Sequence, residues 1–454
     1  HMLGNSTCYT ARWVLPVTSP PIRDGAVVVT ADGLIAGVCA AAKAPAHARI
    51  EPLGDVALIP GLVNVHAHPE LTAFRGLLED RTFERWIPDL VGLKRTARLT
   101  PEDYEVAALW ACAEALANGI TTLAATEDSA ASLPALIATH MRGIVYQEVF
   151  GPSPAVAAEA VGLLSTKVAA LRSRETELVR VGVSPHAPYT VSDELYRRTA
   201  QLALAESLPV AVHAAEAHVE ELLVRDARGP FAESLRGRGI PVQPRARSTI
   251  ALLERTGVLE TRPLVIHAVR VDDEDIAALA GAGAPVAHCP VANARLGHGI
   301  APITEMLDAG ITVALGTDSV ASNNRLDILE EARTAQLFQR ARTGSADVLD
   351  AERLLRMATI DGARALGLDH RIGSLEPGKE ADLCAVALDR PHTSPVNEPY
   401  AALLLAARGS DVVLTAVRGR VLYRAGRHTD LATGDLRQHL ENVASRLRRA
   451  NDPR

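Results

Sequence analysis

The sequence is poor in aromatic residues and in cysteine, and it has no block of charge of one sign. Phe, Trp and Tyr make up 3% of the 454 residues, which disfavours a surface that stacks nucleic-acid bases. The five cysteines are scattered and show no CxxC spacing, a pattern typical of buried thiols in a reducing compartment. The formal net charge is −7 and the sequence shows no long block of basic residues, so nothing in it indicates binding to nucleic acid or to an anionic membrane.

Long apolar runs are also missing. No uninterrupted run reaches the roughly 18 residues of a membrane span, and the N-terminus lacks the charged-then-apolar pattern of a secretory signal. With 48% hydrophobic and 22% charged residues, the chain has the balance of a globular protein. We therefore expect a cytoplasmic protein that acts on a small molecule, with no nucleic-acid or membrane partner. A homodimer stays open as the oligomeric state.

Between residues 58 and 370, short apolar segments alternate with longer helical patterns such as Pro101–Asn118 and Leu326–Arg342. The expected strands are Leu58–His66, Ile120–Thr126, Gly143–Val149, Val179–Ser184, Pro209–His213, Leu264–His267, Ala284–His288 and Thr312–Gly316. Strands that alternate with helices pair in parallel, and eight such units favour a closed (β/α)8 barrel with active groups at the strands' C-terminal ends. An open doubly wound sheet is the alternative, although no GxGxxG follows the first strand.

Strand-like segments flank this region on both sides. They are Ala11–Val17, Gly25–Val29 and Gly33–Val38 before it, and Val412–Val417 and Arg420–Tyr423 after it. The simplest arrangement joins them in one composite β-sandwich domain. The predicted organisation is residues 2–58 with 371–430 as this sandwich, 59–370 as the barrel, and 431–454 as a terminal helix and tail.

Several expected strands end in residues that suit a metal site. His66 and His68 stand at i and i+2, so both face the same side of an extended strand. A lone strand-end histidine is more often a hydrogen-bonded cap. In a closed barrel, however, His213 and Asp318 would join this pair, giving three imidazoles and a carboxylate, a set that binds a divalent ion with one position open to water.

Glu216 follows His213 by three residues and would fall beside that water. A bound divalent ion lowers the pKa of a water towards ~7, and a carboxyl that is not a ligand can carry the proton to the substrate. Asp318 would accept the second proton. We interpret His288 as structural, and His218 and Glu220 as solvated residues of a charged helix.

With these residues in place, the whole chain resembles the amidohydrolase superfamily, in the branch of amino-purine and triazine aminohydrolases. The matching motifs are PGLVNVHAH, SPHAPYT, HAAE, VIHAV, AHCPVANARL, ALGTDSVASNN and GSLEPGKEADL, spread from Pro60 to Leu383. The resemblance implies a (β/α)8 barrel with a composite β-sandwich and one divalent ion, zinc first and iron as the alternative. A single ion is favoured because Val179–Pro188 contains no lysine to bridge two metals.

The resemblance also assigns roles. It implies His66, His68, His213 and Asp318 as metal ligands and Glu216 as the proton shuttle. His267 would orient the attacking water or touch the substrate, and His186 would face a ribose. Glu70, Arg75 and Arg295 are further candidates for substrate groups, against the alternative that each forms a stabilising ion pair.

Within the branch, the finer match is to aminofutalosine deaminase-like proteins of menaquinone biosynthesis, on HAHPEL, on the segment HAAEAHVEELLVRDARGPFAESL and on LDILEEAR. Pro69 and Ala67 depart from the usual motif, and Leu93–Leu99 is basic where related nucleoside deaminases carry an acidic residue for the ribose diol. The leading hypothesis is therefore hydrolytic deamination of a 6-aminopurine nucleoside such as aminofutalosine. The alternatives are deamination of adenosine, adenosylhomocysteine or methylthioadenosine, of guanine, pterin or triazine, hydrolytic dechlorination, and a non-enzymatic scaffold.

Overall fold

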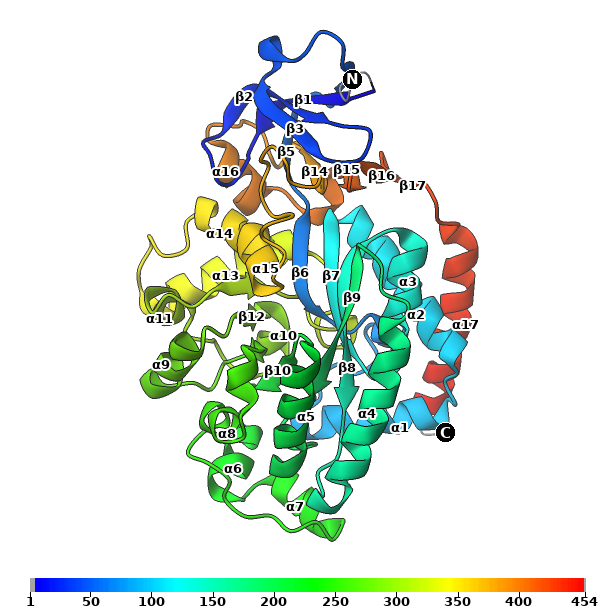
Figure 1. The fold of residues 1–454 in the computed structure, drawn as a ribbon, viewed down its shortest axis with the longest axis vertical. Helices are drawn as coiled ribbons and strands as arrows, with labels where there is room; N and C mark the ends of the chain where they lie inside the picture. Colours follow the sequence, from blue (N-terminus) through cyan, green and yellow to red (C-terminus); the bar gives the residue numbers. More distant parts are fainter. Residues whose placement is uncertain (1–4, 453–454) are drawn as a thin grey trace.

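The computed structural model describes residues 5–452 and has two parts stacked along one axis, a β-rich part and a barrel (Figure 1). Residues 2–4 and 453–454 of the predicted terminal segments lie outside the described residues. The barrel strands run away from the β-rich part, so their C-terminal ends lie at the far end of the molecule (Figure 1). His66, His68 and Asp318 lie together at that end.

The β-rich part is one nine-stranded sheet built from both ends of the chain. Its strands run in the order β17, β16, β15, β14, β5, β1, β2, β3, with β4 also paired to β1. Their bounds are β1 (Thr7–Val14), β2 (Ile22–Val29), β3 (Ile35–Ala40), β4 (Arg49–Pro52), β5 (Val56–Pro60), β14 (Leu383–Ala387), β15 (Val412–Val417), β16 (Arg420–Arg424) and β17 (Arg427–His428). Ile35 of β3 and Leu414 of β15 belong to the same apolar cluster, so the sheet curls over a shared core.

The barrel strands form two parallel four-stranded sheets, in the orders β6-β7-β8-β9 and β10-β11-β12-β13. They are β6 (Leu62–Ala67), β7 (Ile120–Glu127), β8 (Arg142–Val149), β9 (Val179–Pro185), β10 (Ala211–Ala214), β11 (Leu264–His267), β12 (Val286–His288) and β13 (Val313–Leu315). A parallel bridge between Val183 and Val210 joins the two sheets. The amide of Thr317 donates to the carbonyl of His66 at 3.1 Å and ties the chain after β13 to β6, which closes the barrel.

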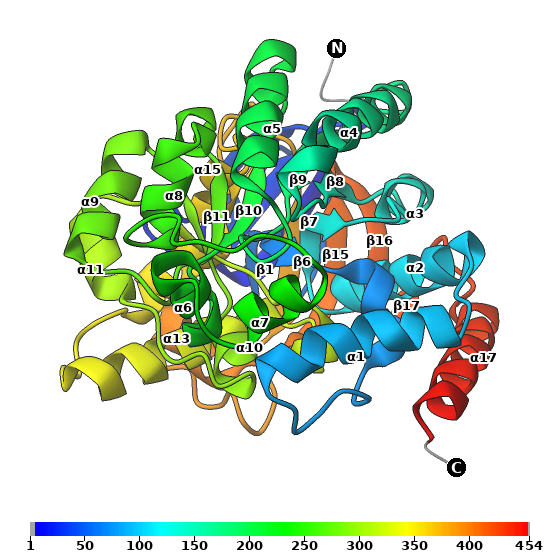
Figure 2. The ribbon, with the colours of Figure 1, turned by 90° about the horizontal axis from the view of Figure 1, so that it is seen from below.

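Helices surround these strands (Figure 2). They are α1 (Phe83–Thr96), α2 (Pro101–Ala117), α3 (Ser132–Thr139), α4 (Ala157–Arg172), α5 (Asp193–Glu206), α6 (His218–Asp226), α7 (Pro230–Gly237), α8 (Thr249–Arg255), α9 (Asp273–Ala282), α10 (Pro290–Arg295), α11 (Ile303–Asp308), α12 (Val320–Asn323), α13 (Ile328–Thr343), α14 (Ala351–Ala358), α15 (Ile360–Ala365), α16 (Pro399–Ala401) and α17 (Thr433–Asn451). Local signals mark the starts of some of these helices; for example, Thr100 and Asp103 form a reciprocal capping box at the start of α2. The predicted (β/α)8 barrel is thus confirmed, with a composite β-domain from both ends of the chain that is one curled nine-stranded sheet where a sandwich was expected.

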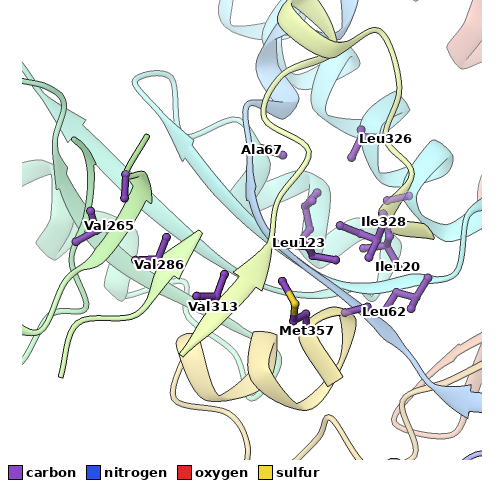
Figure 3. Close-up of a cluster of buried hydrophobic side chains, with 14 of the residues drawn as sticks. Leu62, Ala67, Ile120, Leu123, Val265, Val286, Val313, Leu326, Ile328 and Met357 are labelled. Carbon is purple, nitrogen blue, oxygen red and sulfur yellow. The ribbon is translucent and has the colours of Figure 1, made fainter. Parts of the chain in front are cut away.

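The barrel core lies between the strands and the outer helices. Every residue of β6, β7 and β8 is buried, as expected for parallel strands covered on both faces. Figure 3 shows side chains of β6, β7 and β11–β13 in the same cluster as Ile328 of α13 and Met357 of α14. This packing holds the strand ends rigidly, which a site built from several strands requires.

One predicted strand proved to be two. The expected strand Leu58–His66 is divided between β5, which pairs with β1 and β14 in the composite sheet, and β6 of the barrel. The chain changes sheets at Gly61, where an added Cβ would lie 2.0 Å from Oγ1 of Thr121. The continuous apolar run hid this break, because both strands are fully buried and differ only in their partners. The limits of the predicted domains stay a prediction.

One outer helix is more apolar than the sequence suggested. The segment Pro154–Arg172, which includes α4, is long and apolar enough to cross a membrane by length and composition alone. In the structure α4 packs against β8, β9 and α5, with Leu164 and Val168 buried. An outer helix of a barrel passes the same test.

Candidate active site and metal centre

Four side chains from β6, β10 and the segment after β13 meet at the C-terminal end of the barrel. The ring centroids of His66 and His68 lie 4.8 Å apart, and that of His213 lies 5.0 Å from His66. Oδ1 of Asp318 lies 3.3 Å from Nε2 of both His66 and His68. The structure therefore brings together the three histidines and the aspartate that the sequence put forward.

The backbone is strained where these side chains leave their strands. Ala215, His267 and Asp318 have φ values of 55°, 80° and 58°, in the left-handed region that residues other than glycine rarely adopt. Such conformations cost about 1–3 kcal/mol each and persist where the surrounding structure enforces them. The three residues lie at or shortly after the C-terminal ends of β10, β11 and β13, beside the cluster.

The donor set fits a divalent ion. Nδ1 of His213 lies 2.9 Å from the carbonyl oxygen of His186, to which it donates, so the lone pair of Nε2 is free for a ligand. Nε2 of His66 is buried and has no hydrogen-bond partner among the described residues. Burial lowers the pKa of His66 to about 4, which keeps the imidazole neutral, the form that coordinates metals. Imidazoles with one carboxylate form a donor set that suits zinc and also iron.

Glu216 lies in the same place and is held by two histidines. Its Oε1 is 3.3 Å from Nε2 of His267 and 3.0 Å from Nε2 of His298. Burial raises the pKa of Glu216, but His267 and the hydrogen bond from His298 lower it further, so its pKa is below the usual value. Nδ1 of His267 is 2.9 Å from Oδ1 of Asn293, which orients that ring. Glu216 is therefore ionised at neutral pH.

A cavity of about 210 Å³ opens onto this cluster. Its polar lining comprises His68, Glu70, Lys94, Glu148, His186, Thr190, His213, Glu216, His267 and Asp318. Much of the rest is apolar, with Trp86, Ile87 and Leu90 of α1 on one side and Phe150 after β8 on another. A planar, largely apolar ligand matches such walls, while its polar edge would meet the strand ends.

The structure brings two of the four residues expected at the substrate, Glu70 and His186, to this cavity. It does not bring Arg75 and Arg295, which are absent from the lining drawn from the described residues. Arg75 pairs with Glu114 at 2.6 Å, and Arg295 forms an ion pair with Glu79. Each arginine thus forms an ion pair, the alternative weighed for both of them.

The expectation that Glu220 is solvated is wrong. Its side chain is fully buried, and Oε2 accepts hydrogen bonds from the amide of Ala215 and the hydroxyl of Thr249, each at 2.6 Å. It thus supports the strained turn that carries Glu216. Charge spacing along the helix gave no sign of this role, because the partners come from other parts of the chain. His218 is exposed, as predicted, and His288 is buried.

Sequence reasoning missed two residues near the cluster, Glu148 and His298. Glu148 is the last residue but one of β8 and lines the cavity, and its buried Oε2 makes no hydrogen bond to the described residues. Glu148 follows the same rule as the other strand-end residues, and applying that rule to every strand would have found it. His298 lies in the loop after α10 and does not follow directly on a strand, so the strand-end rule does not select it. Its contact with Glu216 is visible only in the folded chain.

Comparisons with known proteins agree with this geometry. The model of the amidohydrolase family matches residues 57–422. A 5-methylthioadenosine/S-adenosylhomocysteine deaminase of Syntrophobacter fumaroxidans is 34% identical over 434 residues, covering 94% of each chain. A 5'-deoxyadenosine deaminase of Methanothermobacter thermautotrophicus is 32% identical, covering 89% of this chain and 90% of its own. The solved structure of an adenosine deaminase from Xanthomonas campestris with bound zinc has a TM-score of 0.86 at 30% identity, covering 98% of each chain.

Fold and site together define a (β/α)8 barrel with histidines and acids gathered at the C-terminal ends of its strands. The chain belongs to the amidohydrolase family, and the resemblance seen in its motifs is confirmed. The family and these relatives support its assignment to the hydrolytic deaminases.

Proposed function

We propose that this protein removes the 6-amino group of a purine nucleoside by hydrolysis, with Glu216 as its proton shuttle. The observation that carries the proposal is the position of Glu216. It lies at one end of a largely apolar cavity, beside His267 and the cluster of His66, His68, His213 and Asp318. A carboxylate held next to a metal-ligand set is the arrangement that hydrolytic deamination of a purine ring requires.

His66, His68, His213 and Asp318 would hold a divalent ion. When bound, this ion would supply a water with a pKa close to neutrality. Zinc is our first choice and iron the second, because the donor set suits both. Glu216 would take one proton from that water and deliver it to the ring nitrogen next to C6. The water oxygen would bond to C6, Asp318 would take the second proton and pass it to the amino nitrogen, and the C6–N bond would break as ammonia leaves.

The strand ends beside this cluster support a substrate with a sugar. Nδ1 of His186 lies 2.7 Å from the hydroxyl of Thr190, which donates to the carbonyl of Ala187, so Nε2 of His186 carries the lone pair. That Nε2 faces Oε2 of Glu148 at 3.6 Å. Burial lowers the pKa of His186 to about 3 and raises that of Glu148 to about 8. With a pKa of about 8, Glu148 carries its proton near neutral pH, so the pair offers an O–H donor beside the acceptor Nε2, and a sugar hydroxyl can donate to one and accept from the other.

The apolar walls favour a 5′ substituent that is itself largely apolar. Trp86, Leu90 and Val91 of α1 form an apolar part of the cavity wall. A methylthio or deoxy group would add no unpaired charge against this wall. Lys94 is the only lysine or arginine among the described lining residues, and its Nζ is 3.8 Å from Oε1 of Glu70. It provides one cation for a carboxylated 5′ chain, which keeps aminofutalosine, the substrate favoured by the sequence, as the second candidate.

The test uses the full-length, zinc-loaded protein and follows ammonia release. The panel contains adenosine, 5′-methylthioadenosine, 5′-deoxyadenosine, S-adenosylhomocysteine, aminofutalosine, 2′,3′-dideoxyadenosine, adenine, guanine and a chlorotriazine. We expect turnover of the 6-aminopurine ribonucleosides and at least a tenfold lower kcat/KM for the dideoxy compound. Turnover of guanine or the triazine alone would support the other substrates of this branch, and no turnover of any nucleoside would refute the proposal.

A further inference from the structure

His298 contacts Glu216 from behind, outside the cavity. Its side chain is 2% exposed, and it is absent from the described residues that line the cavity, whereas Glu216 is among them. Nε2 of His298 lies 3.0 Å from Oε1 of Glu216. Because an ionised carboxylate only accepts hydrogen bonds, this ring nitrogen must carry the hydrogen and donate it. His298 thus reaches the reacting side chain without reaching the substrate.

The loop around His298 is built to present this ring. Gly297 and Gly299 on either side have φ values of 72° and 106°, which glycine adopts without strain. The amide of His298 donates to the carbonyl of Asn293 at 2.8 Å. Phe83, the first residue of α1, packs edge-on against the imidazole with ring centroids 4.7 Å apart. The backbone hydrogen bond and the contact with Phe83 therefore fix the orientation of the imidazole independently of Glu216.

Both histidine contacts of Glu216 fall on the same carboxylate oxygen. His267 approaches Oε1 at 3.3 Å from the cavity side, and His298 approaches it at 3.0 Å from behind. A glutamate has several rotatable bonds and would otherwise sample several positions, at an entropic cost of up to about 2 kcal/mol when it is held in one. The hydrogen bond from His298 to Oε1 sets the rotation of the carboxylate and leaves Oε2 for the reacting groups.

We propose that His298 is a positioning residue for the proton shuttle, which it serves by holding Oε1 of Glu216 so that Oε2 faces the reacting centre. The proposal rests on the proposed role of Glu216. A proton carrier must come within about 2.6–3.2 Å of the atoms it serves, and a displacement of about 1 Å can cost on the order of a hundredfold in rate. Losing the donor should therefore lower kcat more than it changes KM.

The kinetic test compares His298→Ala with His298→Gln in the zinc-loaded, full-length protein. The amide nitrogen of glutamine reaches about as far as Nε2 of histidine and still donates. We expect the alanine variant to lose about 10- to 100-fold in kcat with KM within about threefold of wild type. The glutamine variant should recover most of this loss, and zinc content should be unchanged in both. A kcat of the alanine variant within twofold of wild type would overturn the proposal.

A double variant separates positioning from a general structural role. If His298 acts through Glu216, His298→Ala should have little further effect on kcat in a Glu216→Gln background, since groups that act as a unit are not additive. A structural role would reduce kcat by the same factor in both backgrounds. Full additivity would therefore refute the proposal.

Crystal structures of wild type and His298→Ala, both zinc-loaded, give a readout that needs no substrate. We expect the carboxylate of Glu216 to rotate or become disordered in the alanine variant and to keep its place in His298→Gln. An unchanged carboxylate in the alanine variant would count against the proposal. If no nucleoside is turned over, the proposed substrate class fails, while these structures still decide the role of His298.

Discussion

Arg142 should be one of the most destabilising positions to change, because it joins the barrel to the composite sheet by a buried ion pair. It begins β8, and its side chain is 1% exposed. Its Nε and Nη2 donate to the two oxygens of Asp382 at 2.8 and 3.0 Å, and Nη2 also pairs with Glu380. Asp382 precedes β14, so the contact crosses between the two parts of the chain.

The expected cost of Arg142→Met follows from what each carboxylate retains. Glu380 keeps Arg371, whose Nη2 lies 2.6 Å away. Asp382 keeps only the amide of Arg418, at 2.9 Å, among its described donors to Oδ1. Removing one partner of a buried pair costs about 3–5 kcal/mol, and because Glu380 is compensated we expect about 3 kcal/mol. With a urea m value of at least about 3 kcal/mol/M, the unfolding midpoint should fall by up to about 1 M.

The assay is urea unfolding followed by circular dichroism, with Arg172→Met as the matched control. Arg172 is 39% exposed and pairs with Glu175 at 3.4 Å, an exposed contact worth about 1 kcal/mol or less. The double variant Arg142→Met with Asp382→Asn should recover part of the loss, since it removes the unpaired charge. A loss for Arg142→Met no larger than that of the control, or no recovery in the double variant, would refute the reasoning.

Three further results are expected. Glu216→Gln should keep its metal and lose at least about 100-fold in kcat, measured as ammonia release with metal analysis; retained activity would exclude the shuttle role. A chelator should abolish turnover and zinc should restore it, whereas His66→Ala should bind zinc too weakly for restoration; full activity of metal-free protein would contradict this. The hydrogen bond from Arg342 lowers the pKa of Glu305 to about 2, so this pair stabilises the fold above about pH 4.5 and loses that effect as the pH falls through about 2. Arg342→Met should therefore weaken the acid dependence of unfolding between these values, and an identical acid profile would show that the pair contributes nothing.

Most barrel strands could be read from the sequence, because parallel strands buried on both faces appear as short apolar runs between helical segments. The predicted strand Leu264–His267 coincides with β11, and the predicted hairpin after Val412 is formed by β15 and β16. The division at Gly61 could not be read, because nothing in one apolar run says which neighbours its two halves will pair with. Glu220 was misjudged for a similar reason, since its hydrogen-bond partners follow from the fold and not from helix spacing.

The sequence by itself determined the kind of chemistry, since histidines and acids that end apolar strands converge in any closed parallel barrel. The sequence pattern alone places His66, His68, His213, Asp318 and Glu216 at one end of the barrel. Only the tertiary structure decided which other side chains reach that end. Arg75 and Arg295 form ion pairs with Glu114 and Glu79. In contrast, Glu148 lines the cavity and His298 contacts Glu216. The physical reason is that a strand's direction is encoded locally, while contacts between loops depend on how distant segments pack.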